Sequence, residues 1–264
     1  MLKVFITGAS SGIGRALAEH YAARGARLGL VARRGELLQG LAARWPAQIV
    51  CYPLDVTDVV ALRAAGEDFI ARFGVPDLVI ANAGVSVGTL TEQAEDLAAI
   101  RRVMEINYFG MAATFSPFIT AMRRAGEGRL VGVASLAGIR GLPGAEAYSA
   151  SKAAVISYLE SLRLELRDSG IKVVTLCPGY VRTPMTEVNP FPMPFLIPAD
   201  EAARRLARAI ARGRSYAVVP WPMGLVGKLL RLLPNALYDR LFAGAPRKPR
   251  FLLNGHGFPD PPER

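Results

Sequence analysis

The chain has 264 residues, 51% of them hydrophobic, and a formal net charge of +10 at pH 7, so it is long and apolar enough to bury a large core in one α/β domain. Its two cysteines, Cys51 and Cys177, lie far apart in apolar runs, which argues against a disulfide framework and favours reduced thiols in a cytoplasmic protein. No apolar run reaches the roughly eighteen residues of a membrane span, and the first strand-like run begins at Leu2, so we expect no secretory signal.

Strand-like runs alternate with helical stretches along the chain. Strands that alternate with helices, and that are nearly continuous in Val, Ile and Leu, predict a parallel sheet with helices on both faces. We therefore predict a single-domain, Rossmann-type, doubly wound parallel sheet of about seven strands. Ligands of such sheets bind outside the carboxyl ends of the strands. The predicted strands cover residues 2–6, 27–32, 48–54, 77–82, 129–135, 172–177 and 216–219.

A glycine-rich turn, TGASSGIG at residues 7–14, follows the first run and precedes a predicted helix. Such a turn leaves backbone N–H groups at the positive end of the helix dipole, where a diphosphate can be held. The spacing differs from the G-x-G-x-x-G fingerprint, and a turn without a ligand is the alternative. The residues predicted to bind a dinucleotide here are Gly8, Ser10, Ser11, Gly12, Ile13 and Gly14.

Two arginines, Arg33 and Arg34, follow the second run. Proteins that select NAD place an acidic residue about twenty positions beyond the glycine turn, whereas an arginine there accommodates the 2′-phosphate of NADP. The pair therefore favours NADPH as the cofactor. The alternative is that both arginines are ordinary solvated surface residues.

Polar residues also follow the third and fourth runs. Asp55 is predicted to accept a hydrogen bond from the adenine amino group of the cofactor, or else to cap the next helix. Asn82 opens the sequence Asn-Ala-Gly, a bend of small residues that would let a flat ring approach the sheet. A tight turn without a ligand is the alternative for this bend.

The candidate catalytic residues are Ser135, at the end of the fifth run, and Tyr148 with Lys152 on the following helix. Residues four apart share one face of a helix, so the ammonium is expected close to the phenol. Because a free tyrosine has a pKa of about 10, it is a poor base at neutral pH. A neighbouring cation stabilises the phenolate and lowers that pKa, which suits the tyrosine to proton transfer.

These motifs together resemble the short-chain dehydrogenase/reductase family, in its NADP-preferring branch. The resemblance runs in order from Leu2 to about Thr183, with family-like character to about Val219. It rests on TGASSGIG at 7–14, NAG at 82–84, Ser135, YSASK at 148–152 and PGYVRT at 178–183.

The resemblance implies a role for each matching residue. Tyr148 would be the general acid or base, and Ser135 would hydrogen-bond the substrate oxygen. Lys152 would bind the nicotinamide ribose and lower the pKa of the tyrosine. Asn107, in MEINYFG, would hold a water that passes protons through the lysine. The remaining implied residues are Val181 and Thr183, which would bind the nicotinamide carboxamide, and the family's members are often dimers or tetramers.

The expected function is reduction of a ketone or aldehyde of a medium-sized apolar substrate to an alcohol by hydride transfer from NADPH. An alcohol dehydrogenase that runs oxidatively, and a dinucleotide-binding scaffold or regulator without catalysis, are the alternatives. His20 and His256 have no ligand spacing with each other or with the cysteines, so we expect no metal site.

The predicted catalytic domain spans residues 1–219 and includes a substrate lid at about 184–200. Prolines in this lid alternate with apolar side chains, which suits an apolar substrate. The alternative is that these side chains only cover the protein's own core. They are Phe191, Met193, Phe195, Leu196 and Ile197.

An amphipathic extension is predicted at 220–243, followed by a flexible, Pro-, Gly- and Arg-rich tail at 244–264. The extension would place Gly224, Gly227, Lys228 and Arg231 opposite its leucines, and it would lie on a membrane surface, a second subunit or the protein's own core. Residues 201–264 carry 12 basic and 4 acidic side chains, a net +8. This asymmetry suggests an anionic partner or simply a solvated face. No nucleic-acid-binding motif accompanies the charge, so we expect no nucleic acid partner.

Overall fold

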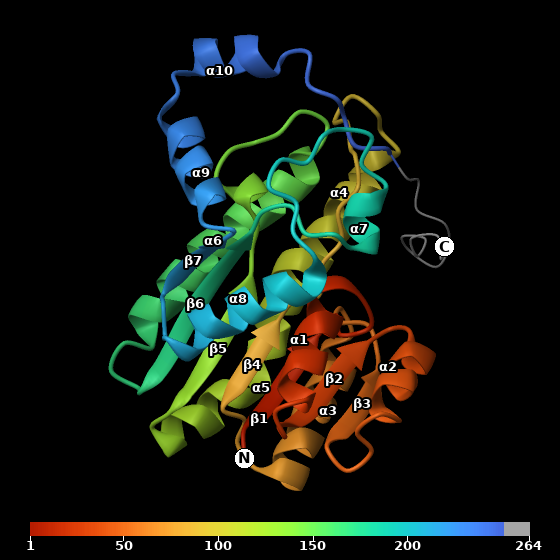
Figure 1. Ribbon diagram of the computed structural model, residues 1–264, viewed down its shortest axis with the longest axis vertical. Helices are drawn as coiled ribbons and strands as arrows, with labels where there is room; N and C mark the ends of the chain where they lie inside the picture. Colours follow the sequence, from red (N-terminus) through yellow and green to blue (C-terminus); the bar gives the residue numbers. More distant parts are fainter. Residues whose placement is uncertain (251–264) are drawn as a thin grey trace.

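Seven parallel strands form one sheet in the order β3-β2-β1-β4-β5-β6-β7 in the computed structural model, which describes residues 1–250 (Figure 1). The prediction of a single α/β domain with a doubly wound sheet is confirmed. Each predicted strand lies within two residues of its observed bounds. These are β1 (Lys3–Thr7), β2 (Arg27–Ala32), β3 (Ile49–Pro53), β4 (Leu78–Ala81), β5 (Gly128–Val133), β6 (Ile171–Pro178) and β7 (Tyr216–Val219).

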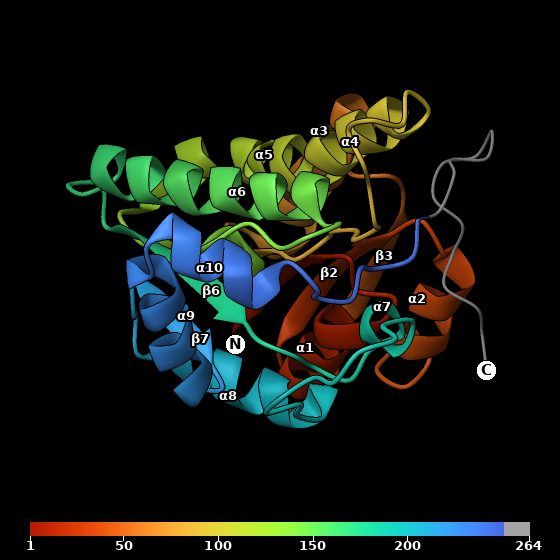
Figure 2. The same ribbon diagram turned by 90° about the horizontal axis from the view of Figure 1, so that it is seen from above.

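Helices cover both faces of the sheet. Figure 2 shows α3 (Val59–Phe73), α4 (Asp96–Met104), α5 (Gly110–Ala125) and α6 (Glu146–Glu165) on one face. The opposite face carries α1 (Gly12–Ala22), α2 (Gly35–Ala42) and α8 (Ala199–Ala211). The other elements are the π-helical turn η1 (Glu105–Phe109), the 3₁₀ turn η2 (Leu136–Gly138), α7 (Pro184–Glu187), α9 (Pro222–Leu232) and α10 (Asn235–Phe242).

The two faces of the sheet bury separate apolar cores. Along β1, Val4 and Ile6 pack into the core under α1 and α8, whereas Phe5 points to the core under α3 and α5. Successive strand residues point to opposite faces. The ring of Phe5 lies 5.5 Å from Phe69 and 4.9 Å from Phe118, measured between ring centroids. Because both faces are covered, the central strands are apolar throughout rather than alternating.

The strand order reverses at β1, which pairs with β2 on one side and with β4 on the other. The loops after β1 and β4 therefore diverge and leave a crevice at the carboxyl ends of the two strands. In doubly wound sheets this crevice is the usual place for a ligand.

The predicted C-terminal extension folds as two helices, because Pro234 separates α9 from α10. The glycine side of α9 faces the protein: Met223 and Gly227 are buried, and a side chain at position 227 would collide with Ile139. Leu229 is 63% exposed and Leu232 is 80% exposed. The helix thus packs on its own core through its small residues and leaves leucines at the surface.

The first residues of the predicted flexible tail contact the rest of the protein. Arg250 forms ion pairs with Asp96 (2.8 Å) and Glu95 (3.3 Å). The backbone of Pro249 accepts a hydrogen bond from Gly88 (2.9 Å). Residues 246–250 are therefore held in place by specific contacts. The rest of the predicted tail, residues 251–264, lies outside the described residues.

Candidate active site

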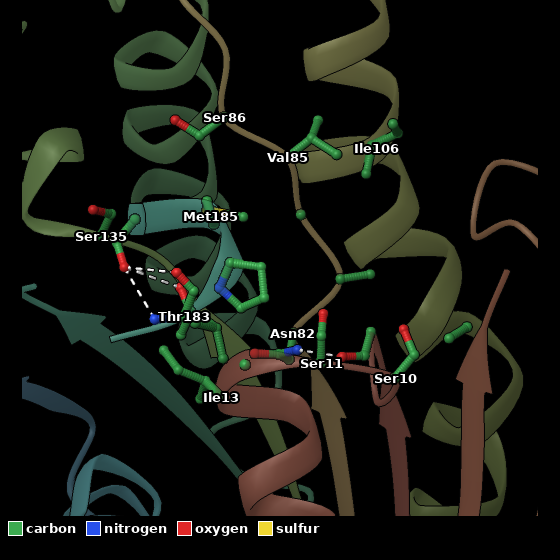
Figure 3. A pocket seen from close by; sticks show the side chains of 18 of the residues that line it. Ser10, Ser11, Ile13, Asn82, Val85, Ser86, Ile106, Ser135, Thr183 and Met185 are labelled. Atoms are coloured by element: carbon green, nitrogen blue, oxygen red, sulfur yellow. Dashed lines mark hydrogen bonds between the residues drawn. The ribbon is translucent and has the colours of Figure 1, made fainter. Parts of the chain in front are cut away.

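A pocket of about 330 Å³ opens at the carboxyl ends of the strands. Every site residue predicted from the sequence lines it, except Gly14 and Asn107. Figure 3 shows the pocket with Ser10 and Ser11 at one end, Ser86 at the other, and Ser135 to one side. The lining also includes residues that the sequence analysis did not single out, among them Val85, Ser86, Val87, Pro184, Met185, Thr186 and Val188.

The glycine turn has the conformation that an anion-binding loop needs. Gly8 and Gly12 have positive φ angles of 70° and 55°. A Cβ on Gly14 would collide with the carbonyl oxygen of Gly8, so α1 can approach the turn only with glycine there. Within the described residues, the Ser11 side chain makes no capping hydrogen bond to the first turn of α1. The N–H groups of that turn therefore remain available to a diphosphate, and the residues present fit a dinucleotide.

Asn82 holds the glycine turn from the neighbouring strand. Its side-chain nitrogen donates to the carbonyl oxygens of Thr7 (3.1 Å) and Gly8 (3.2 Å). The hydroxyl of Thr7 accepts in return from the backbone N–H groups of Asn82 and Ala83. The Asn82 side chain therefore holds the glycine turn in position at the edge of the pocket.

The two arginines after β2 sit at one rim of the pocket. Arg34 is partly buried and donates to the hydroxyl of Ser10 (3.3 Å), so its guanidinium is placed next to the glycine turn. Arg33 is exposed and also lines the pocket. Both positions lie where the sequence predicts that a 2′-phosphate binds.

Asp55 does not cap the following helix. Asp58 caps α3 instead, by accepting a hydrogen bond from the N–H of Ala61 (3.0 Å). The Asp55 carboxylate accepts from the backbone and the hydroxyl of Thr57 (2.9 Å each) and forms an ion pair with Arg102 (2.7 Å). These contacts fix its carboxylate at the pocket wall.

The catalytic candidates come from two adjacent elements. Ser135 lies two residues after the end of β5, and its hydroxyl accepts from the N–H of Ala137 (3.2 Å). Tyr148 and Lys152 lie one turn apart on α6, with the Lys152 ammonium 5.8 Å from the centroid of the tyrosine ring. The ammonium donates to the carbonyl oxygen of Val133 (2.8 Å), the last residue of β5. The strand and the helix thus hold all three side chains at one wall of the pocket.

The protonation of this wall differs from the sequence-based expectation. Burial raises the pKa of Tyr148 above its usual value, although a hydrogen bond with Ser135 acts in the opposite direction. Burial also lowers the pKa of Lys152 to about 8. The sequence predicts that the ammonium lowers the tyrosine pKa, whereas burial acts in the opposite direction. The tyrosine is therefore protonated at neutral pH and can act as an acid.

Asn107 lies in the π-helical turn η1 and is fully buried. Its side-chain oxygen accepts from the N–H of Val85 (2.8 Å), and its nitrogen donates to the Val85 carbonyl (3.0 Å) and to Ser151 (2.9 Å). Single π-helical turns within α-helices are frequent at functional sites. The side chain ties the loop after β4 to α6, and its predicted role in a proton relay stays a prediction.

Only part of the predicted substrate lid reaches the pocket. Thr183 forms a capping box with Thr186 at the start of α7, and both line the pocket with buried Val181. Ile197 instead pairs with Val181 and belongs to the core, and Phe195 is exposed. The apolar residues expected to cover the substrate are thus outside the pocket lining, whereas residues 184–186 and 188 belong to it.

Metal ligands do not gather anywhere in residues 1–250. This part of the chain contains no group of three or more His, Cys, Asp or Glu residues that would hold a metal ion. None of its helices has both the length and the apolar character needed to span a bilayer.

Comparisons with known proteins agree with this architecture. The model of the short chain dehydrogenase family matches residues 3–190. An uncharacterized oxidoreductase of Myxococcus xanthus is 40% identical over 237 residues, which cover 89% of this chain and 93% of that protein. A short chain dehydrogenase of Burkholderia cenocepacia, solved in complex with NADP, has a TM-score of 0.79 at 29% identity and covers 91% of this chain and 97% of its own. A short chain dehydrogenase/reductase of Burkholderia phymatum, solved in complex with NAD, has a TM-score of 0.78 at 25% identity over 96% and 98% of the two chains.

Proposed function

The chain belongs to the short chain dehydrogenase family and is an oxidoreductase, and on that premise we propose that it reduces a ketone or aldehyde of a medium-sized, largely apolar substrate to an alcohol with NADPH. The observation that carries the proposal is the meeting of Ser135, Tyr148 and Lys152 with the glycine turn in one pocket. A scaffold that only binds a dinucleotide has no need of all three side chains.

The residues at the glycine-turn end of the pocket would hold the cofactor. Ser11, Gly12 and Ile13 suit the diphosphate because the first N–H groups of α1 face it. Arg33 and Arg34 supply positive charge for a 2′-phosphate, which favours NADPH over NADH. When bound, NADPH supplies the hydride. The remaining assignments are Asp55 near the adenine and Val181 with Thr183 near the nicotinamide carboxamide.

The three catalytic candidates, Ser135, Tyr148 and Lys152, would then transfer the proton. Because burial keeps Tyr148 protonated, its hydroxyl can donate a proton to the substrate oxygen as a carbonyl is reduced. The Ser135 hydroxyl donates a hydrogen bond to the same oxygen as negative charge develops there. The nearby Lys152 ammonium stabilises the phenolate that remains. A residue that starts protonated suits reduction rather than oxidation.

The pocket lining bears on the class of substrate. Val85, Ile106, Met185 and Val188 supply apolar contacts. The oxidative direction remains the alternative reaction for the same residues, with an alcohol as substrate.

The test measures NADPH consumption by the purified protein against a panel of apolar ketones and aldehydes, with NADH and a Tyr148→Phe variant in parallel. We expect turnover that prefers NADPH and falls about 10²- to 10⁴-fold in the variant, since a positioned acid contributes that much. Tight NADPH binding without turnover of any carbonyl or alcohol would favour the scaffold. Faster turnover of alcohols with NADP than of carbonyls with NADPH at neutral pH would favour the oxidative alternative.

We further propose that the protein is cytoplasmic and works as a homo-oligomer. Phe109 is 61% exposed at the end of η1, and Leu229 is 63% exposed on α9, so apolar surface is available for a second subunit. The alternative is that α9 contacts an anionic membrane surface, because the C-terminal part of the chain is basic. Sedimentation of the protein with and without anionic vesicles separates the two, because only membrane contact makes it co-sediment with the vesicles.

A further inference from the structure

A C-terminal strap, residues 246–250, lies against two segments that line the pocket, although its own residues are outside the lining. After α10 the chain turns back and runs between α7 and the loop that precedes α4, as Figures 1 and 2 both show. The N–H of Gly88 donates to the carbonyl of Pro249 (2.9 Å). A side chain at Gly88 would collide with the carbonyl oxygen of Lys248. The strap therefore lies directly on the loop that follows β4.

One ion pair with a buried carboxylate anchors the end of the strap. Arg250 donates to both oxygens of Asp96 (2.8 and 3.0 Å), and Asp96 is only 2% exposed. The same carboxylate accepts from the backbone of Leu90 (2.8 Å). The Arg250 guanidinium holds the pKa of the Asp96 carboxyl below its usual value, so the pair is charged at neutral pH. This anchor fixes the position of Lys248, two residues earlier.

The Lys248 ammonium joins two walls of the pocket. It donates to the hydroxyl of Ser86 (3.1 Å) and to the carbonyl oxygen of Met185 (3.2 Å). Both partners line the pocket, Ser86 from the loop after β4 and Met185 from α7. Figure 3 shows Ser86 at the end of the pocket away from Ser10 and Ser11, so this ammonium is near the substrate end.

No acidic side chain in residues 1–250 forms an ion pair with Lys248, and Asp96, the buried carboxylate beside the strap, is already paired with Arg250. Burial lowers the pKa of Lys248 to about 8. Its two partners are neutral oxygens, whereas an ammonium has three N–H donors. A partly buried charge without a counter-charge is costly, and an anion beside it would remove that cost.

We propose that Lys248 binds an anionic group, a carboxylate or a phosphate, on the part of the carbonyl substrate remote from the carbon that is reduced. The proposal rests on the proposed function and narrows its substrate class to molecules with an apolar body and an anionic end. The phosphates of the cofactor are the other source of the same chemistry. The position of Ser86, at the opposite end of the pocket from Ser10 and Ser11 in Figure 3, favours the substrate.

The experiment compares a medium-chain keto acid with its methyl ester as substrates of the NADPH-dependent reaction. The variant is Lys248→Gln, which keeps a hydrogen-bond donor toward Ser86 but removes the charge. Lys228→Gln is the matched control, since Lys228 is an exposed lysine of α9 outside the pocket lining. We expect kcat/KM for the acid to fall about 10- to 100-fold in Lys248→Gln, with the ester changed less than about twofold, because hydrogen bonds to charged groups are worth that range. Lys248→Arg should retain most of the preference for the acid.

Binding measurements keep this test separate from the proposed function. Calorimetry of the keto acid and of NADPH with each variant gives a Kd that needs no turnover, and thermal melts check that each variant is folded. Weaker NADPH binding together with equal losses for acid and ester would assign the anion to the cofactor and overturn the substrate assignment. Unchanged values for every ligand would overturn the proposal altogether. If the wild-type protein reduces neither substrate, the proposed function fails, but weaker keto acid binding by Lys248→Gln would still support the anionic site.

Discussion

The side-chain nitrogen of Asn82, at the end of β4, lies 3.2 Å from the carbonyl oxygen of Gly8 in the glycine turn and donates a hydrogen bond to it. A second bond from the same nitrogen reaches the Thr7 carbonyl. The neighbouring strand thus sets the shape of the turn that would receive the diphosphate.

We predict that Asn82→Ala weakens NADPH binding about 10-fold. The variant loses two hydrogen bonds, each worth roughly 1 kcal/mol, and the turn is then less well ordered before the cofactor binds. Titration of NADPH fluorescence gives the Kd. Asn235→Ala, an exposed position on α10, is the control and should leave the Kd unchanged. Equal Kd values for Asn82→Ala and the wild type would contradict the structural task assigned to Asn82.

Gly14→Ala should destabilise the protein by roughly 1–3 kcal/mol, because the added methyl group collides with the Gly8 carbonyl and the backbone must shift. Gly40→Ala is the matched control: it is a helical glycine of α2, and a methyl group added there would point into open space. That change should raise stability by up to about 1 kcal/mol, since alanine is the better helix former. Urea unfolding of both variants measures the difference, and equal midpoints would refute the argument from close approach.

Arg34→Glu should weaken the proposed preference for NADPH. The guanidinium beside Ser10 is replaced by a carboxylate that repels a 2′-phosphate. We expect the ratio of kcat/KM for NADPH to that for NADH to fall at least 10-fold, with most of the change in the KM for NADPH. Arg124→Glu, exposed at the end of α5, controls for the change in net charge. A ratio that does not move in Arg34→Glu would remove this residue from the cofactor site.

The cofactor-free protein should gain stability between pH 8 and pH 10 through Lys152. Its pKa is lowered from 10.5 to about 8 by burial, so in this window the unfolded chain holds a proton that the folded chain has lost. Stability rises with pH wherever the unfolded state binds more protons. The full gain in the free energy of unfolding is on the order of 3 kcal/mol, and most of it is reached by about pH 10.

Comparison with Lys152→Met isolates this contribution. Lys248 has a similar lowered pKa of about 8 in both proteins, so its effect cancels in the difference. Denaturant unfolding at pH 7, 8, 9 and 10 should show that the free energy of unfolding of the wild type increases relative to that of the variant as the pH rises. Parallel curves would mean that the buried ammonium keeps its ordinary pKa.

The sequence predicts the fold well because the fold depends on local patterns. Runs such as 27–32 and 216–219 coincide with β2 and β7, since short apolar runs between helical stretches have few other solutions in a chain of this length. The alternation of strands and helices then leaves a parallel sheet with covered faces. The glycine turn, Ser135, Tyr148 and Lys152 are found for the same reason: their spacing is local, and the sheet brings the ends of its strands together.

The sequence is less informative wherever a side chain has a choice of distant partners. It leaves Asp55 between the adenine and a helix cap, whereas the fold gives its carboxylate Thr57 and Arg102, and Asp58 caps the helix. It also predicts that Lys152 lowers the tyrosine pKa, whereas burial of Tyr148 raises it. Desolvation depends on everything packed around a group, which no spacing of residues reveals.

The sequence by itself determined the doubly wound sheet, the glycine turn and the catalytic candidates, because each follows from a period or spacing along the chain. Only the tertiary structure decided the place of the strap at 246–250. Lys248 meets Ser86 and Met185, 162 and 63 residues away in the sequence, because Arg250 finds a buried partner in Asp96. A segment rich in proline and arginine has no local pattern that specifies such contacts, so its position depends on the surface that the rest of the chain presents once it has folded.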